Sequence, residues 1–289
     1  MNILRWVLIG ALSFQCVSAS AQDTSTISLV VGFKAGGTST TSARLVAQAI
    51  EETTRHHVLV ENRSGATGLI AAKWVKRQKP DGRTLLFVSS SSALSVPPTD
   101  ELVAVAVVAM YDYFVVIKKD TAATLPEYFE AARHQDALRS VATPGAGSMA
   151  HLLGEKLFRS KGIQFKNVPY LGAVDAVRDV LGGHVPAAIV PYPDYIGHKD
   201  DDGLRSMLAT IDGKIIAEGW MGVYAPAKTP PEEVRRLSEI FRVAVERSKD
   251  KLEKVGFRAV WKKGSELRRL HDKDYANFLP EITRLSIKP

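Results

Sequence analysis

The sequence predicts an α/β fold in which a parallel sheet is covered by helices on both faces. Short apolar stretches rich in β-branched residues alternate with stretches whose apolar residues recur at helical spacing. This alternation is typical of parallel strands joined by helical crossovers. Two apolar stretches, at residues 103–110 and 113–117, follow each other without a helix between them. We interpret this break in the strand–helix alternation as the place where the chain crosses between two lobes.

The first 21 residues have the pattern of a secretory signal peptide. Arg5 supplies the positive charge, an apolar stretch too short to span a bilayer follows, and Ala19-Ser20-Ala21 places cleavage near Ala21. The single cysteine, Cys16, lies in this segment, so the mature chain has no disulfides, thiol catalysis or Cys-ligated zinc. Export without cysteines indicates a bacterial periplasm.

The formal net charge of the whole chain is +7 at pH 7. The basic residues are mixed with acidic ones over 55–83 and 235–284, which is typical of a solvated surface. Attraction of anionic solutes or of a membrane partner is the alternative interpretation. Nucleic-acid binding is not expected, because no recognisable module and no basic stripe interleaved with aromatic residues is present.

The first predicted strand, at 27–33, ends in a glycine turn that opens a helix. Two glycines at 36 and 37 permit the turn, and apolar residues at 43, 46, 47 and 50 have helical spacing. The candidate N-caps are Thr38, Ser39 and Thr40. Free backbone N–H groups and the positive end of the helix dipole meet there, which suits a carboxylate. Neither GxGxxG nor GxxxxGK[ST] follows, so nucleotide binding has no support.

Two further strands end in the same way. The strand at 58–61 is followed by the glycine-containing stretch 62–68, a helix over 69–78 and a turn at 79–82. The strand at 84–88 ends in a run of four serines. Because ligands of parallel sheets bind beyond the carboxyl ends of the strands, we expect residues 36–38, 64–67 and 89–92 to share one edge.

The second half of the chain repeats the first junction. After a helix over 125–134, a strand at 140–142 runs into Thr143-Pro144-Gly145-Ala146-Gly147-Ser148 and a helix over 149–159. Two such junctions on separate sheets would hold one anionic ligand from both sides. The predicted elements beyond this junction are a strand at 165–170, a helix at 173–181 ending at Gly182-Gly183, a strand at 187–190, a loop at 191–203, strands at 205–210 and 220–225, a helix capped by Thr229 and running to 247, and a helix at 265–286 broken or kinked at Pro280.

Three features raise catalytic or metal-binding alternatives. For His151 we favour a histidine satisfied by a backbone carbonyl over an acid/base group, which would need a carboxylate partner. Ser148 as a nucleophile lacks the G-x-S-x-G elbow. The acidic triplet Asp200-Asp201-Asp202 lacks the alternating spacing of a calcium loop, so a solvated turn is expected.

Seven segments resemble the periplasmic solute receptors of tripartite tricarboxylate transporters, the TctC or Bug family. They are VVGFKAGGTSTTSARLVAQAI (30–50), VLVENRSGATGLIAAKWV (58–75), PDGRTLL (80–86), GAGSMAHLLGEKLF (145–158), VPYLG (168–172), DVLGGHV (179–185) and WMGVYAPAKTP (220–230). The resemblance covers essentially the whole mature chain. It implies a type II periplasmic binding protein, two α/β lobes that close on a ligand, with no cofactor.

The resemblance also implies ligand contacts from the strand-end loops. Carried over by position, they are Phe33, Ala35, Gly36, Gly37, Thr38, Thr40, Ser64, Ala66, Thr67, Ser89, Ser90, Thr143, Gly147, Ser148 and His151. One lobe would contain residues 22–110 and 224–289, and the other 111–223. The implied ligand is a small carboxylate, and the implied partners are membrane permease subunits of a tripartite tricarboxylate-type transporter; the clamp interpretation suggests a monomer.

The chain departs from the family pattern at several positions. The family commonly has an aspartate where Thr40 stands, and its loss argues against an amino-acid ligand. Lys34 adds a positive charge beside the site if it points inward; a solvent-facing lysine is the alternative. The stretch between Thr210 and Trp220 is shorter than is usual.

The leading hypothesis is a periplasmic receptor that delivers a small carboxylate to a permease. A second hypothesis keeps the same clamp but has a sensor kinase read its closed form. A third, a periplasmic enzyme acting on a small acid, is disfavoured, because the sequence has no metal-ligand cluster and no paired-carboxylate site.

Overall fold

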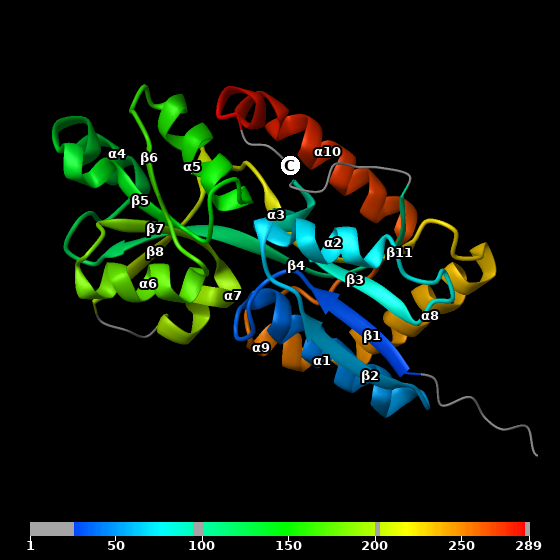
Figure 1. Ribbon diagram of the computed structural model, residues 1–289. Helices are drawn as coiled ribbons and strands as arrows, with labels where there is room; N and C mark the ends of the chain where they lie inside the picture. Colours follow the sequence, from blue (N-terminus) through cyan, green and yellow to red (C-terminus); the bar gives the residue numbers. More distant parts are fainter. Residues whose placement is uncertain (1–25, 95–100, 200–202, 287–289) are drawn as a thin grey trace, which may run out of the picture.

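Figure 1 shows the computed structural model of the chain, which describes residues 26–94, 101–199 and 203–286. The predicted signal peptide, with Cys16, and the triplet Asp200-Asp201-Asp202 lie outside these ranges. No helix within the three ranges is long and apolar enough to cross a membrane. The described chain has a mixed α/β fold, as the alternating sequence pattern predicts.

One ten-stranded sheet runs through the described molecule in the order β2-β1-β3-β11-β4-β7-β5-β6, with β8 and β12 also paired to β4. Its strands are β1 (Thr26–Val31), β2 (His57–Asn62), β3 (Thr84–Ser89), β4 (Leu102–Lys118), β5 (Ser140–Thr143), β6 (Lys166–Pro169), β7 (Ala187–Pro191), β8 (Leu204–Leu208), β11 (Glu218–Pro226) and β12 (Lys262–Lys263). The strands β1, β2 and β3 are parallel, as are β5, β6 and β7. The strands β4 and β11 run antiparallel to their neighbours. The short loop before Trp220 holds a separate hairpin, β9 (Thr210–Ile211) and β10 (Lys214–Ile215).

Strand β4 joins the two halves of the sheet. The prediction of two strands, at 103–110 and 113–117, is wrong, because they form one 17-residue strand. The polar residue between them, Asp112, pairs with Glu218 on β11, and its Oδ2 accepts from Arg258 Nη1 at 2.7 Å. The first part of β4 pairs with β11 and β12, and the last part pairs with β7 and β8. The two glycine junctions therefore lie on one connected sheet, whereas the lobe boundaries stay a prediction.

The helices follow the predicted spacings with some corrections. They are α1 (Thr38–Thr53), α2 (Leu69–Val75), α3 (Ser90–Ala93), α4 (Leu125–His134), α5 (Met149–Ser160), α6 (Ala173–Gly182), α7 (Tyr192–Tyr195), α8 (Pro231–Arg247), α9 (Lys249–Lys254) and α10 (Gly264–Arg284), with short 3₁₀ helices η1 (Ala66–Gly68), η2 (Asp136–Arg139) and η3 (Ile196–His198). The predicted loop at 191–203 thus contains α7 and η3. Thr229 does not cap α8, because its hydroxyl donates to the Pro226 carbonyl at 2.7 Å. Helix α10 runs on through Pro280.

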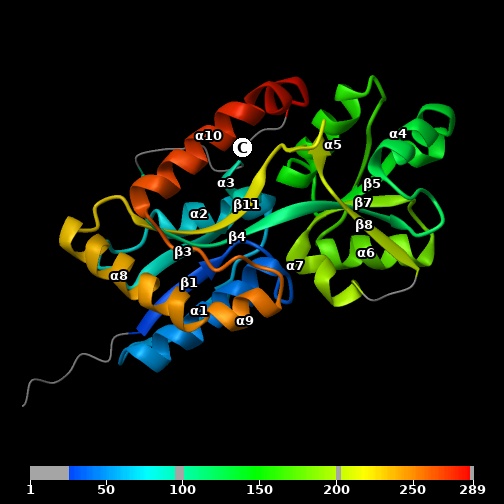
Figure 2. The same ribbon diagram turned by 180° about the vertical axis from the view of Figure 1, so that it is seen from behind.

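Helices cover both faces of each half of the sheet (Figures 1 and 2). Helices α1, α8 and α9 lie on one face beside β1–β3, and α2, α3 and α10 lie on the other. In the second half, α4 and α5 cover one face, and α6 and α7 the other. Because side chains alternate along a strand, Val115 and Ile117 of β4 pack in the cluster that contains α4 and α5. Val116 packs on the opposite face of the sheet, in the cluster that contains α6. Leu181, predicted on the buried stripe of α6, is 39% exposed, since it lies beyond the face that holds Val177 and Val180.

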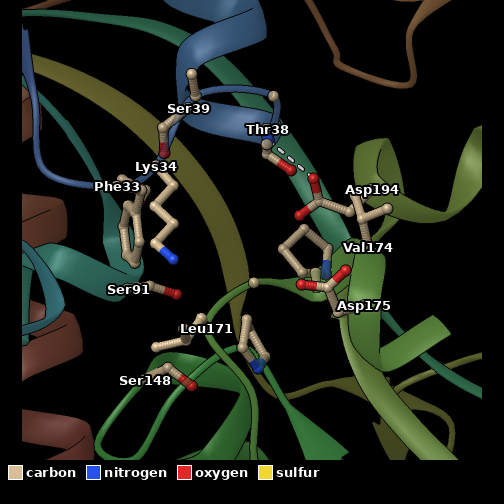
Figure 3. Close-up of a pocket in the computed structure, with 18 of the residues that line it drawn as sticks. Phe33, Lys34, Thr38, Ser39, Ser91, Ser148, Leu171, Val174, Asp175 and Asp194 are labelled. Carbon is tan, nitrogen blue, oxygen red and sulfur yellow. Dashed lines mark hydrogen bonds between the residues drawn. The ribbon is translucent and has the colours of Figure 1, made fainter. Parts of the chain in front are cut away.

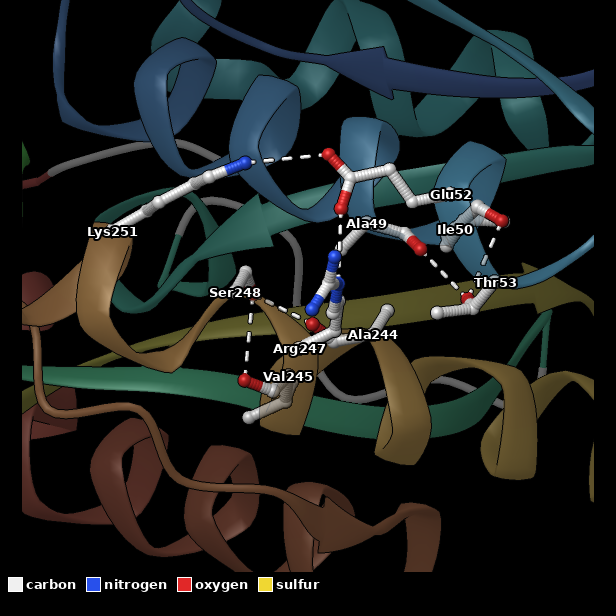
Figure 4. Close-up of polar contacts among 9 residues, drawn as sticks. All are labelled: Ala49, Ile50, Glu52, Thr53, Ala244, Val245, Arg247, Ser248 and Lys251. Carbon is white, nitrogen blue, oxygen red and sulfur yellow. Dashed lines mark hydrogen bonds and ion pairs between the residues drawn. The ribbon is translucent and has the colours of Figure 1, made fainter.

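Polar contacts fix α1 against the α8–α9 corner (Figure 4). Glu52 accepts from Lys251 Nζ at 3.3 Å and from Arg247 Nε at 3.1 Å, and these hydrogen bonds lower the pKa of its carboxyl. The Ser248 hydroxyl donates back to the carbonyl of Ala244 at 2.7 Å, where α8 ends. The pairs are exposed and contribute little individually to stability. They lie at the end of α1 opposite to the first glycine junction.

The end of α10 contacts α5, far away in the sequence. Arg159 donates to Glu281, whose side chain is 2% exposed, and Arg284 donates to Glu155. Each helix contributes one arginine and one glutamate, so the arginine comes from α5 in one pair and from α10 in the other. The pairs connect α10 to α5, whose N-cap is Ser148.

Candidate functional site

A cavity of about 400 Å³ lies between the loops at the carboxyl ends of the strands. This volume is in the range of small-molecule pockets. Its lining comes from both halves of the sheet (Figure 3). The lining residues are Phe33, Lys34, Ala35, Gly36, Gly37, Thr38, Ser39, Ser89, Ser91, Tyr111 and Met221 from the half with β1–β3, and Pro144, Ser148, Leu171, Gly172, Ala173, Val174, Asp175, Arg178, Pro191 and Asp194 from the other half.

The N-terminus of α1 forms one wall and already holds a carboxylate. The backbone N–H of Thr38 donates to Asp194 Oδ1 at 2.8 Å, a contact between residues 156 positions apart. The N-cap of α1 is Gly37, with no side-chain cap, so the predicted caps Thr38, Ser39 and Thr40 are wrong. The acid of α7 replaces a local cap by bonding the first N–H of the helix. The junction thus holds a carboxylate of the protein itself, which the dipole and the N–H groups of the helix N-terminus favour.

The floor of the cavity is a cluster of hydroxyl groups. Ser91 and Tyr111 line the cavity, and Ser91 Oγ lies 3.1 Å from Tyr113 Oη. Ser90 Oγ lies 3.3 Å from the hydroxyls of both tyrosines. Burial raises the pKa of Tyr111 and of Tyr113, so both phenols keep their protons. The floor can therefore donate hydrogen bonds to an anion without being charged itself.

The second junction faces the first across the cavity. Ser148 lines it and is the N-cap of α5, where its hydroxyl accepts from the backbone N–H of His151 at 3.3 Å. Leu171, 76% exposed, and the start of α6 form the rim. Asp175 and Arg178 pair with each other there at 3.8 Å, and both side chains are more than half exposed.

Seven of the predicted contact residues line the cavity: Phe33, Ala35, Gly36, Gly37, Thr38, Ser89 and Ser148. Eight lie outside the lining: Thr40, Ser64, Ala66, Thr67, Ser90, Thr143, Gly147 and His151. Several of these eight support the loops. Thr40 Oγ1 donates to the Lys34 carbonyl and accepts from Asn62 Nδ2, Thr143 Oγ1 donates to Asn167 Oδ1, and Thr67 Oγ1 donates to the Ala146 carbonyl at 3.5 Å. The loops after β1 and β3 thus share the expected edge at the cavity, and the loop after β2 packs beside them.

His151 stabilises the second junction. Its Nδ1 accepts from the backbone N–H of Gly147 at 2.9 Å, so the prediction of a satisfied histidine is confirmed, but with an N–H partner in place of a carbonyl. Glu155 Oε1 lies 3.7 Å from Nε2 and is the carboxylate that the alternative interpretation lacked. Burial lowers the pKa of His151, which keeps the ring neutral and able to accept that bond.

Sequence reasoning missed the cavity residues from α7, β4 and α6, among them Asp194 and Tyr111. Asp194 lies in the stretch predicted as a loop, but it follows directly on β7, a fourth strand whose carboxyl end reaches the site. The rule that ligands bind beyond the carboxyl ends of parallel strands would have identified Asp194 as a candidate. Lys34, for which the sequence left two orientations open, lines the cavity with its side chain pointing inward (Figure 3). Within the described ranges no group of acids, histidines or cysteines could hold a metal ion.

Burial raises the pKa of Asp194 to about 6, against the opposing effect of its hydrogen bonding to Thr38. The folded state therefore binds a proton at a pH where the unfolded state does not. The resulting stabilisation is complete below the ordinary pKa of 3.8 and is lost as the pH rises through about 6.

We expect the wild type to gain about 1 kcal/mol of unfolding free energy relative to Asp194→Asn when the pH is lowered from 7.5 to 5. Asparagine keeps the acceptor for Thr38 but does not titrate. Urea denaturation of both proteins at the two pH values measures this difference. A difference that is the same at both values would contradict the assignment.

Two α/β halves with a ligand-sized cavity between their strand-end loops define a periplasmic binding protein fold. Solved structures of similar fold agree. The structure of the periplasmic binding protein BugD has a TM-score of 0.79 and 19% identity, covering 91% of this chain and 98% of that one. The Rhodopseudomonas palustris protein Rpa4515 with adipate has a TM-score of 0.83 and 23% identity, covering 93% and 99%. MatC from the same species with bound malate has a TM-score of 0.77 and 20% identity, covering 88% and 97%.

The family follows from the sequence itself. Residues 42–214 match the sequence model of the tripartite tricarboxylate transporter family receptor, and the chain belongs to this family. Protein BugT of Bordetella pertussis is 28% identical over 261 residues, covering 80% of this chain and 79% of BugT. A second relative, from Bordetella bronchiseptica, is 29% identical over 260 residues, covering 80% of this chain and 77% of that protein. The resemblance stated from the sequence motifs is thereby confirmed.

Proposed function

We propose that this protein is a periplasmic receptor that binds a small carboxylate in the cavity between the two junctions and delivers it to a tripartite tricarboxylate-type permease. The family membership supports the receptor role, and relatives of the same fold carry malate and adipate. The observation that carries the proposal for this chain is Lys34, which points into the cavity beside the N-terminus of α1.

The remaining anion-binding groups lie around that wall. Lys34 brings a positive charge into the cavity, and the hydroxyls of Ser91 and Tyr111 form its floor. The Thr38 hydroxyl lies at the same wall beside Asp194.

Binding would favour the closed arrangement of the lobes, because the cavity takes its lining from both. In this proposal residues 1–21 are the signal peptide, residues 22–110 and 224–289 form one lobe, and residues 111–223 form the other. The receptor acts as a monomer and without catalysis.

A thermal-shift screen of residues 22–289, first refolded from denaturant to remove copurified ligand, tests the proposal. The panel contains mono-, di- and tricarboxylates, with sugars and amines as controls. A ligand that binds only the folded state raises the melting temperature by mass action. We expect shifts from acids alone. A folded protein that responds to none of the acids would overturn the carboxylate proposal.

A further inference from the structure

A carboxylate from one half of the sheet lies on the N-terminus of a helix from the other half. Asp194 belongs to α7, directly after β7, and its Oδ1 accepts from the backbone N–H of Thr38, the first residue of α1, at 2.8 Å. Figure 3 shows this bond at the wall of the cavity, into which the Lys34 side chain points from the loop before α1. The bond therefore joins the two halves of the sheet at the cavity.

The N-terminus of α1 has no negative group of its own. The helix has 16 residues, its N-cap Gly37 carries no side chain, and its first turn contains no acidic residue. Asp194 is therefore the carboxylate that meets the positive end of the helix dipole and the first N–H groups. Hydrogen bonds from the hydroxyl and the N–H of Thr38 favour the charged form of Asp194 and oppose the rise of its pKa that burial causes. A ligand carboxylate would be held there in the same way.

Packing fixes helix α7 in this position. It lies against the turn that follows α9, where a Cβ added to Gly256 would be 3.1 Å from Tyr192 Cδ1 and 3.2 Å from Pro193 Cα. Pro193 stands in the first turn of α7, where a helix tolerates proline. The ring centroids of Tyr192 and Phe114, on β4, are 5.0 Å apart. The backbone that carries Asp194 is thus held beside α1 by contacts other than the bond to Thr38.

A ligand carboxylate is attracted to the place that Asp194 occupies. Lys34 supplies the cation of this wall, and α1 supplies the positive end of its dipole. The second cation of the lining, Arg178, pairs with Asp175 at the rim at 3.8 Å. One N–H group holds one carboxylate oxygen at full strength, and two carboxylates side by side repel each other. An acid that approaches Lys34 therefore competes with Asp194 for the N-terminus of α1.

We propose that Asp194 is an internal competitor, a carboxylate that occupies the anion position at the N-terminus of α1 and leaves it when an acid binds. This inference rests on the proposed function and adds a regulation of the same site. The Asp194 side chain rotates away from Thr38 while α7 stays in place, and the incoming carboxylate takes the N–H. The cost of breaking the Asp194 contact lowers the affinity for different acids in the same proportion, and it eases their release.

Calorimetry at pH 7.5 on the emptied protein measures this competition, with succinate, adipate and citrate as probes. Asp194→Ala frees the Thr38 N–H. We expect it to bind the tightest of the three probes at least about tenfold more tightly than the wild type does, the value of a hydrogen bond to a charged group. Asp194→Asn keeps an acceptor for Thr38 but loses the charge, so its affinity should lie between the two. Asp250→Asn, exposed on α9 and outside the cavity lining, is the matched control and should bind like the wild type.

A crystal structure of the wild type with the same probe does not depend on the folding of a variant. We expect a probe oxygen within about 3 Å of the Thr38 nitrogen and the Asp194 carboxylate turned away. A complex in which Asp194 still bonds Thr38 would overturn the inference but leave the carboxylate receptor intact. The same holds if Asp194→Ala binds no more tightly than the wild type, or no more tightly than Asp194→Asn. Failure of all three probes to bind the wild type and both Asp194 variants would instead overturn the proposed function, and this inference with it.

Discussion

Gly219→Ala is expected to lower the free energy of unfolding by about 2–3 kcal/mol, the upper part of the range for overpacked core substitutions. Gly219 on β11 lies directly opposite Tyr111 on β4, and the tyrosine ring lies over the glycine. A Cβ at this position would be 2.0 Å from the nearest ring carbon. The ring is 2% exposed and cannot move outward without breaking the hydroxyl cluster under the cavity.

A double-mutant cycle separates this clash from a backbone effect. In a Tyr111→Ala background the added methyl group has room, so Gly219→Ala should cost nothing there and gain the β-propensity of alanine over glycine. Gly172→Ala is the control, because nothing lies within 4 Å of its added Cβ. Denaturant unfolding of the five proteins measures the coupling. A cost of Gly219→Ala that persists without the tyrosine ring would contradict the explanation.

Lys34→Gln is expected to weaken binding of the acid with the largest thermal shift by roughly 10- to 100-fold, the value of a hydrogen bond to a charged group. Lys34 lies in the loop between β1 and α1 and is the cation that points into the cavity from that side. Glutamine keeps a donor but loses the charge, so the salt dependence of binding should also decrease.

Lys228→Gln is the matched control, since Lys228 is exposed on the turn before α8 and does not line the cavity. It should change the affinity by less than about twofold, as surface substitutions usually do. Calorimetry at two salt concentrations gives both quantities. Equal affinities of Lys34→Gln and wild type would assign the lysine to the solvent, the alternative that the sequence left open.

Most helices and strands could be predicted from the sequence because each carries its own local signal. The 3.6-residue spacing of Ala43, Val46, Ala47 and Ile50 is enough to place α1, since these side chains all face the core. The glycine junctions could also be predicted locally, because each has glycines between an apolar stretch and a segment of helical spacing. The capping of α1 was predicted wrongly, because Gly37 is its N-cap and the Thr38 N–H bonds Asp194 from a distant segment.

The parts that escaped prediction depend on contacts between distant segments. The continuity of β4 across Asp112 follows its pairing with β11, and the cavity acid Asp194 comes from a stretch without periodicity. Half of the site therefore follows from the turns that the sequence displays. The other half, from α6, α7 and the middle of β4, follows from the way the sheet brings strand ends together.

The crystal structure of the protein with the tightest-binding acid of the panel would test the central claim most directly. The account predicts that the ligand lies between the Phe33–Ser39 loop and the Leu171–Asp175 loop, with its carboxylate within hydrogen-bond distance of Lys34 or Ser91 and contacts to both halves of the sheet. A ligand bound outside this cavity, or held by one half with the carboxylate turned away from Lys34 and the serines, would contradict it.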